Sequence, residues 1–77
     1  MNKKYQGVIT KYFPKRQFGF ILIPALQSDA YFNIVSIMGR DPPTEGDCVT
    51  CEVKSGQRGF YAMNIHLHPK SALDHSA

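Results

Sequence analysis

The chain contains two cysteines and three histidines, whose side chains could bind a metal ion or carry redox chemistry. Cys48 and Cys51 have the C-x-x-C spacing of zinc and thiol-redox sites. On a strand, however, residues three apart face opposite sides, and the sequence has no second cysteine pair. His66 and His68 share a strand face, and we expect them and His75 to be solvated residues near the chain end. The sequence therefore predicts a core Cys51, a surface Cys48 and no metal site.

Patterns that would indicate catalysis are missing from the sequence. None of its serines lies in a nucleophile-elbow motif, and no paired carboxylates mark a cleft. There is also no P-loop and no glycine-rich dinucleotide motif. We expect a protein that is not an enzyme and that uses no cofactor and no small-molecule substrate.

The 77 residues, of which 43% are hydrophobic and 19% charged, suffice for one small globular domain. The longest apolar stretch, residues 18–26, is interrupted by Pro24 and is shorter than the roughly 20 residues of a membrane span. The basic N-terminus leads into no apolar signal region. With only two cysteines, the reducing cytoplasm is the simplest compartment, and we expect no membrane partner.

Charge is distributed unevenly along the chain. Residues 1–28 hold five basic side chains and no acidic one, whereas residues 29–77 hold four basic and six acidic ones. A positive half-surface suits a polyanion such as a nucleic acid. A chance cluster of surface charge is the alternative, and charge alone does not decide between them.

Short apolar segments separated by turn residues predict an all-β protein with five strands. We expect a closed, five-stranded antiparallel barrel of the OB type, because closure removes exposed sheet edges. It should occupy residues 1–67, with residues 68–77 as a flexible C-terminal tail and one 3₁₀ turn near residues 36–38. The predicted strands cover residues 7–13, 18–23, 30–35, 48–53 and 60–67. The predicted core consists of Ile9, Ile21, Ile23, Phe32, Val49, Cys51, Val53 and Ile65.

The segment Arg16-Gln17-Phe18-Gly19-Phe20-Ile21 is the most informative one. On a strand, Phe18 and Phe20 share one face with Arg16, while Ile21 points to the other. If Ile21 is in the core, the two phenylalanines lie outside, where nucleic-acid bases could stack on them. The opposite arrangement, with both phenylalanines in the core, remains open on this segment alone.

Two further segments favour the first arrangement. In residues 29–34, Tyr31 and Asn33 share a face, so that a ring for stacking lies beside an amide for hydrogen bonding. Lys11-Tyr12-Phe13 again sets a cation beside two aromatic rings. The chain has nine aromatic side chains, more than so small a barrel can enclose, and several must therefore lie outside.

Together these segments resemble the cold-shock domain family, small OB-type barrels that bind single-stranded RNA and DNA. Residues 11–13 are similar to the family's lysine-tryptophan-phenylalanine, residues 16–21 to its first ribonucleoprotein motif, and residues 29–34 to its second. Residues 45–53 and 56–65 resemble the fourth strand and the closing hairpin. The resemblance spans roughly residues 6–67. It implies Lys11, Tyr12, Phe18, Phe20 and Tyr31 as binding residues.

The sequence departs from the family pattern at several binding positions. Tyr12 stands in place of a tryptophan, Gln17 of a glycine, Asn33 of a histidine and Ile34 of a phenylalanine. The loop of residues 38–45 carries no aromatic side chain, which implies a smaller stacking surface. Phe60 and Tyr61 stand where the family more often has proline and glutamine, and they could restore aromatic area.

We therefore expect a cytoplasmic protein that binds single-stranded RNA or DNA, with a mild preference for pyrimidines. The resemblance implies a role as an RNA chaperone or a regulator. The alternative is an OB-type module that binds another protein, or one domain of a larger protein. The candidate nucleic-acid-binding residues are Lys11, Tyr12, Phe13, Arg16, Phe18, Phe20, Tyr31, Asn33, Arg58 and Tyr61.

Overall fold

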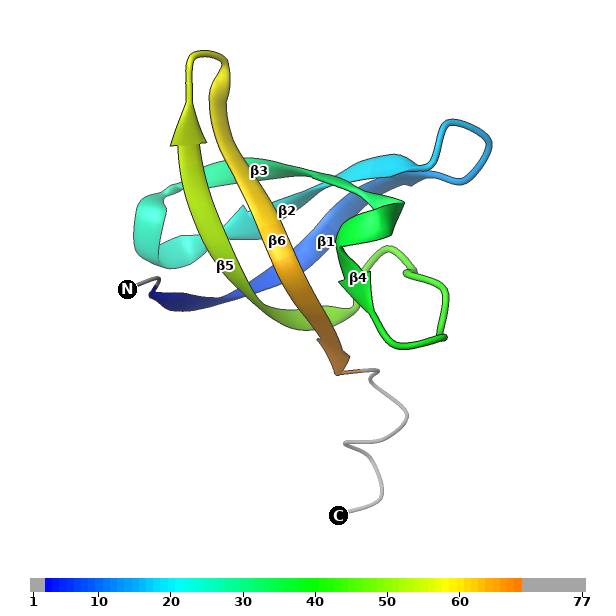
Figure 1. The fold of residues 1–77 in the computed structure, drawn as a ribbon. Helices are drawn as coiled ribbons and strands as arrows, with labels where there is room; N and C mark the ends of the chain where they lie inside the picture. Colours follow the sequence, from blue (N-terminus) through cyan, green and yellow to red (C-terminus); the bar gives the residue numbers. More distant parts are fainter. Residues whose placement is uncertain (1–2, 69–77) are drawn as a thin grey trace, which may run out of the picture.

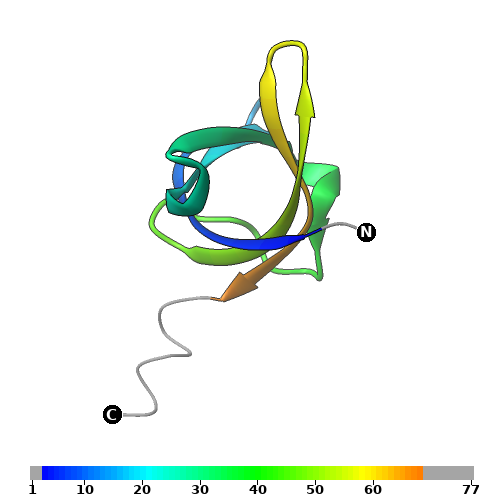
Figure 2. The same ribbon diagram turned by 90° about the vertical axis from the view of Figure 1, so that its left-hand side faces the viewer.

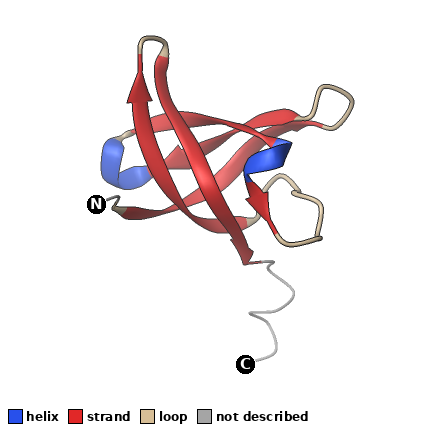
Figure 3. Ribbon diagram, viewed as in Figure 1, coloured by secondary structure: helices blue, strands red, loops and turns tan. Residues whose placement is uncertain are grey.

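Prolines and turn residues divide the chain into strands. The computed structural model describes residues 3–68. The predicted tail therefore lies outside the described residues except for His68, which is the last residue of β6. Two three-residue 3₁₀ helices, η1 and η2, are the only helices in this part of the chain, and neither could cross a membrane (Figure 3). The elements are β1 (Lys4–Phe13), β2 (Phe18–Ile23), η1 (Pro24–Leu26), β3 (Ser28–Asn33), η2 (Ile34–Ser36), β4 (Ile37–Met38), β5 (Cys48–Gly56) and β6 (Gly59–His68).

The five long strands close into a barrel, as the ring of strands in Figure 2 shows. Neighbours follow the order β3-β2-β1-β5-β6, and β3 pairs with β6 to close the ring. The predicted five-stranded barrel is therefore confirmed, but it is not wholly antiparallel. The closing pair β3–β6 is parallel, because the chain crosses the barrel through η2 and β4 before it enters β5. The two-residue β4 also pairs with β6 in parallel.

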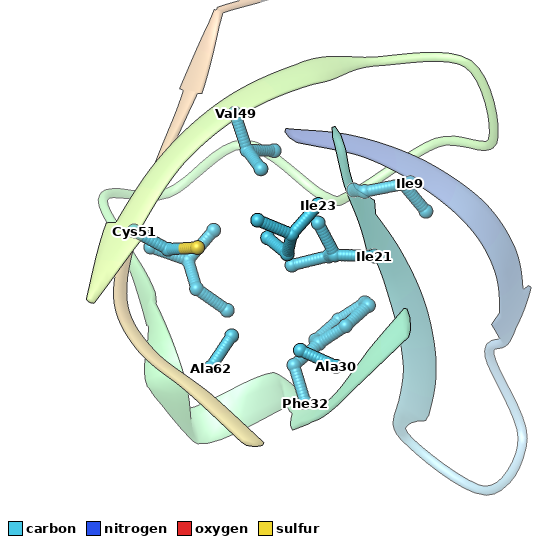
Figure 4. Close-up of a cluster of buried hydrophobic side chains, with 9 residues drawn as sticks. Ile9, Ile21, Ile23, Ala30, Phe32, Val49, Cys51 and Ala62 are labelled. Atoms are coloured by element: carbon cyan, nitrogen blue, oxygen red, sulfur yellow. The ribbon is translucent and has the colours of Figure 1, made fainter. Parts of the chain in front are cut away.

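The core fills the barrel with mainly aliphatic side chains and the ring of Phe32 (Figure 4). Seven of the eight predicted core residues are buried, and alternation along the strands accounts for them. Val53 is only half-buried, because the β5–β6 hairpin extends past the end of the barrel (Figure 1). The buried side chains of this core are Ile9, Ile21, Ile23, Ala30, Phe32, Val49, Cys51, Ala62 and Ile65.

Two irregularities bend the strands around this core. In β1 the register with β2 shifts between Ile9 and Lys11, so that Ile9 and Tyr12 both lie toward the inside. In the β5–β6 pair a second shift falls opposite Asn64, whose φ is 50°. Such bulges increase the local twist and re-aim the side chains that follow.

Gly19 is required where β2 passes beneath the β1 bulge. A Cβ at this position would lie 2.3 Å from the carbonyl oxygen of Lys11 and 2.8 Å from the Phe32 ring. Only glycine lets the two strands and the central ring approach so closely. Gly19 thus allows β2 to carry Phe18 and Phe20 on its outer side while Phe32 fills the inside.

Gln17 occupies a backbone conformation that favours glycine. It ends the turn between β1 and β2 with φ at 61°, and its N–H donates a hydrogen bond to the Phe13 carbonyl at 2.8 Å. The left-handed region costs an L-residue about 1–2 kcal/mol, which a substitution by glycine would relieve. The higher entropy of glycine in the unfolded chain offsets part of that gain. We expect Gln17→Gly to raise the free energy of unfolding by about 0.5–1 kcal/mol, as measured by urea denaturation.

Gln57 provides the matched control for this substitution, because it lies in the β5–β6 turn and its φ is not positive. Gln57→Gly should leave the free energy of unfolding unchanged or lower it. An equal gain from both substitutions would show that the strain at Gln17 is not its source.

Candidate nucleic-acid interface

Four aromatic rings from β1, β2 and β3 gather on the outer side of the barrel. The strand register sets Phe13 opposite Phe18, and Phe20 opposite Tyr31. Ring centroids lie 5.1 Å apart for Phe13–Phe18, 5.6 Å for Phe18–Tyr31, and 6.0 Å for both Phe18–Phe20 and Phe20–Tyr31. We refer to Phe13, Phe18, Phe20 and Tyr31 as the aromatic face.

The rings of the aromatic face remain partly open to solvent although they cover one another. Phe18 and Phe20 are half-buried, whereas Ile21 on the opposite side of β2 is fully buried. Phe13 and Tyr31 are about two-fifths exposed, at 41% and 40%. Partly exposed rings such as these offer flat apolar surfaces on which bases can stack.

Tyr12 does not join the aromatic face. The β1 bulge sets it opposite Gly19, on the inner side, where its ring stacks on Phe32 with a centroid separation of 6.1 Å and an interplanar angle of 14°. Its backbone N–H donates a hydrogen bond to the Glu45 carboxylate at 3.0 Å. Among the candidates from this segment, Lys11 and Phe13 share the outer side with the aromatic face, and Tyr12 packs against the core instead.

A groove of about 860 Å³ continues the aromatic face toward the β5–β6 hairpin. Residues of β2, β3 and η2 line one side of it, and residues of the β5–β6 hairpin line the other. Figure 1 shows that this hairpin projects past the barrel end. The parallel pairing of β3 with β6 makes Tyr31 and Tyr61 neighbours on adjacent strands, and both side chains line the groove. The lining residues are Phe20, Tyr31, Asn33, Ser36, Gln57, Arg58, Gly59, Phe60, Tyr61 and Ala62.

Asn33 has a structural role as well as its place in the groove. It is the N-cap of η2, and its side-chain oxygen accepts a hydrogen bond from the Val35 N–H at 3.1 Å. Asparagine is one of the preferred N-cap residues. Because the oxygen is engaged, the amide NH₂ is the part of Asn33 that remains for a ligand.

Basic side chains flank the aromatic rings at both ends. Lys15 and Arg16 lie in the turn that joins Phe13 to Phe18, and Lys11 is opposite Phe20. Arg58 is at the tip of the β5–β6 hairpin and lines the groove. No acidic residue lines this groove in the described part of the chain. The arrangement gives a strand of nucleic acid cations for its phosphates on either side of the rings.

Cys48 and Cys51 face opposite sides of β5, as expected for residues three apart on a strand. Cys48 is exposed, and Cys51 lies in the core, where burial raises the pKa of its thiol to about 11. His68 is hydrogen-bonded to the Thr50 hydroxyl at 2.9 Å. Within residues 3–68, no three potential ligands gather closely enough to hold a metal ion. His75 lies outside the described residues.

Five groove residues were not among the candidate binding residues: Ser36, Gln57, Gly59, Phe60 and Ala62. Phe60 is also partly packed against the core. Proximity along the sequence to Arg58 was the available signal for Gln57, and the aromatic side chain was the signal for Phe60. No sequence signal pointed to Ser36, because it reaches the groove only through the turn of η2.

Comparison with known proteins identifies the fold. No protein-family model matches the sequence, and no curated protein does. Solved structures do match, among them the cold-shock domains of Drosophila Unr described as CSD456, with a TM-score of 0.76 and 21% sequence identity. The alignment covers 92% of this chain and 29% of the Unr chain. The chain therefore has the OB-type barrel fold of a cold-shock domain.

Proposed function

We propose that this protein binds single-stranded RNA or DNA by stacking bases on the aromatic face. The observation that carries the proposal is the set of four mutually contacting, partly exposed rings on one side of the barrel. So much exposed aromatic surface is unusual in a small soluble domain unless a ligand covers it. The cold-shock-domain fold supports the same interpretation.

Each element of the site has a part in this proposed mechanism. Bases stack on Phe13, Phe18, Phe20 and Tyr31, while Lys11, Lys15, Arg16 and Arg58 neutralise phosphates. Because every base has an aromatic face, stacking alone gives little sequence preference, and the preference for pyrimidines is mild. Tyr12 acts from the core side, where it supports Phe32 beneath β2.

In the cell, such binding would hold strands unpaired and so melt weak secondary structure without ATP. We propose an RNA-chaperone or regulatory role of this kind, with no catalytic step and no cofactor. The cytoplasm is the proposed compartment, since both Cys48 and Cys51 are free thiols. The chain spans 29% of the Unr chain that it matches, and a place within a larger assembly of such domains is compatible with the proposal.

Salt dependence tests whether an oriented site for a polyanion exists. Lys11→Ala and Arg16→Ala should each weaken binding to oligothymidine and oligouridine about equally. Each should also reduce the slope of log affinity against log salt by about 0.7 per lost phosphate contact, because fewer counterions are released from the single strand. Fluorescence titrations at two or more salt concentrations measure both effects.

Lys4 serves as the control, because it lies at the far end of β1 from Phe13 and opposite Glu52. Lys4→Ala should leave the slope nearly unchanged. Equal effects from all three substitutions would mean that only net charge matters. If the wild-type protein binds neither oligonucleotide, the nucleic-acid proposal fails and the protein-binding module becomes the better hypothesis.

A further inference from the structure

We propose that the groove beside the aromatic face clamps one base of the bound strand between Tyr31 and Tyr61. This inference rests on the proposed function and adds residues of the β5–β6 hairpin to the proposed binding site. A base on the aromatic face is covered on one side only, whereas a base in the groove would be enclosed by β3 on one side and the β5–β6 hairpin on the other. Tyr61 would thus be a determinant of affinity that the other strands do not supply.

The β3 wall is already arranged for stacking. Tyr31 stacks on Phe18 at an interplanar angle of 27°, and Phe20 meets Tyr31 edge-on at 72°. Phe18 therefore occupies one face of the Tyr31 ring and leaves the other for a ligand. Because Tyr31 also lines the groove and is 40% exposed, a base has access to it there.

On the hairpin side of the groove, Gly56 leaves room for the ring of Tyr61. A Cβ at this position would lie 2.8 Å from the Tyr61 Cε1 atom and 2.9 Å from its hydroxyl oxygen. The tyrosine ring can rest directly on the hairpin backbone only because Gly56 has no side chain. Tyr61 is nevertheless 44% exposed, so the ring keeps a surface for a ligand. A wall that is ordered before binding loses less entropy when the ligand arrives.

The chemistry of the groove favours a nucleotide over a peptide or a lipid as its occupant. Two tyrosines and two phenylalanines supply flat apolar surface, and Arg58 supplies a cation at the open end. The amide NH₂ of Asn33 and the Ser36 hydroxyl supply polar groups beside the rings. Aromatic walls for the base, polar groups for its edge and an unopposed cation for its phosphate are together the complement of one nucleotide.

A double-substitution cycle tests the clamp with an oligothymidine of about eight nucleotides, which is within the usual site size of one OB fold. Tyr31→Ala and Tyr61→Ala should each lower affinity at least about fivefold, in keeping with the loss of one stacked base. If both rings enclose the same base, removing the second ring costs little more once the first is gone. The double variant should therefore lose much less than the product of the two single losses.

Matched variants separate the ring from its other effects. Tyr61→Phe keeps the ring and should bind within about twofold of wild type, as should Val35→Ala, which removes a side chain outside the groove that is 84% exposed. Gly56→Ala keeps Tyr61 but displaces its ring, and should reproduce most of the loss. This second route tests the clamp even if Tyr61→Ala impairs folding.

The possible outcomes distinguish this inference from the proposed function. If wild type binds the oligonucleotide, and Tyr61→Ala and Gly56→Ala bind it with the affinity of wild type, the clamp is overturned and binding by the aromatic face stands. If the two single losses multiply, Tyr31 and Tyr61 contact different bases, which also overturns the clamp. If wild type does not bind the oligonucleotide at all, the proposed function fails first. Non-additive losses with normal binding by Tyr61→Phe support the clamp.

Discussion

Phe20→Ala should lower the affinity for single-stranded oligothymidine by about five- to 150-fold, which corresponds to the roughly 1–3 kcal/mol of one stacked base. Phe20 occupies the junction of the site, since its ring contacts both Phe18 and Tyr31 and also lines the groove. Its loss removes stacking surface from both parts of the interface. Fluorescence titration at constant salt measures the change.

The effect of Phe20→Ala on stability should be much smaller. The ring is half-buried, and its two edge-to-face contacts stabilise the fold by about 1 kcal/mol or somewhat more. Leu22→Ala is the matched control, because Leu22 follows on the same outer side of β2, is 40% exposed and does not line the groove. It should bind within about twofold of wild type. If Phe20→Ala melts the protein and leaves affinity intact, the aromatic face serves packing and the binding proposal loses its main support.

Ile21→Ala, one residue further along β2, should do the reverse. Ile21 has no exposed surface and lies between Ile9 of β1 and Ala30 of β3. Truncating a buried isoleucine costs about 2–5 kcal/mol, which is a large share of the stability of a domain this small. We expect a free energy of unfolding lowered by that amount in urea denaturation, with near-normal affinity for the fraction that stays folded.

Val35→Ala provides the reference for Ile21→Ala, because the Val35 side chain is 84% exposed and should change stability by less than about 0.5 kcal/mol. A loss below about 1 kcal/mol at Ile21 would mean that the core relaxes into the space, and that the barrel depends less on close packing than its burial suggests.

Local patterns in the sequence were sufficient to predict β2 to the residue. Its alternation is bounded by the Pro14–Gln17 turn and by Pro24, and both limits hold in the structure. β3 was predicted to reach residue 35, but it ends at Asn33, whose side chain caps η2. Asparagine occurs both within strands and at helix N-caps, so its residue type alone does not show where β3 ends. In the structure, the hydrogen bond from the Val35 N–H identifies Asn33 as the N-cap.

The position of Tyr12 could not be predicted from alternation. Strict alternation from Ile9 would direct Tyr12 outward and its neighbours Lys11 and Phe13 inward. The bulge after Ile9 reverses that parity. It coincides with long-range bonds from Ile9 to the loop before β5, in which its N–H donates to the Asp47 carbonyl and its own carbonyl accepts from Gly46. No residue in β1 itself predicts these hydrogen-bond partners of Ile9.

The groove depends on contacts that are even more distant in sequence. Tyr61 was a candidate because of its residue type, but its place beside Tyr31 follows from the parallel pairing of β3 with β6. That pairing requires the chain to cross the barrel end through η2 and β4. The outward positions of Phe18, Phe20 and Tyr31 were therefore predictable from local segments, whereas the position of Tyr12 and the hairpin side of the groove were not.

The parallel β3–β6 pairing also has a consequence for the order of folding. β1, β2 and β3 are joined by short turns and can pair as soon as they are synthesised, whereas β6 emerges after all the other strands of residues 3–68. Contacts between residues so far apart in sequence form slowly, since a long loop must close first. A nascent or partly folded chain would thus present the aromatic face without Tyr61. A nucleic-acid strand bound in the groove would contact both β3 and β6 and so stabilise their pairing. It should slow amide hydrogen exchange in β3 and β6 more than in the β1–β2 hairpin.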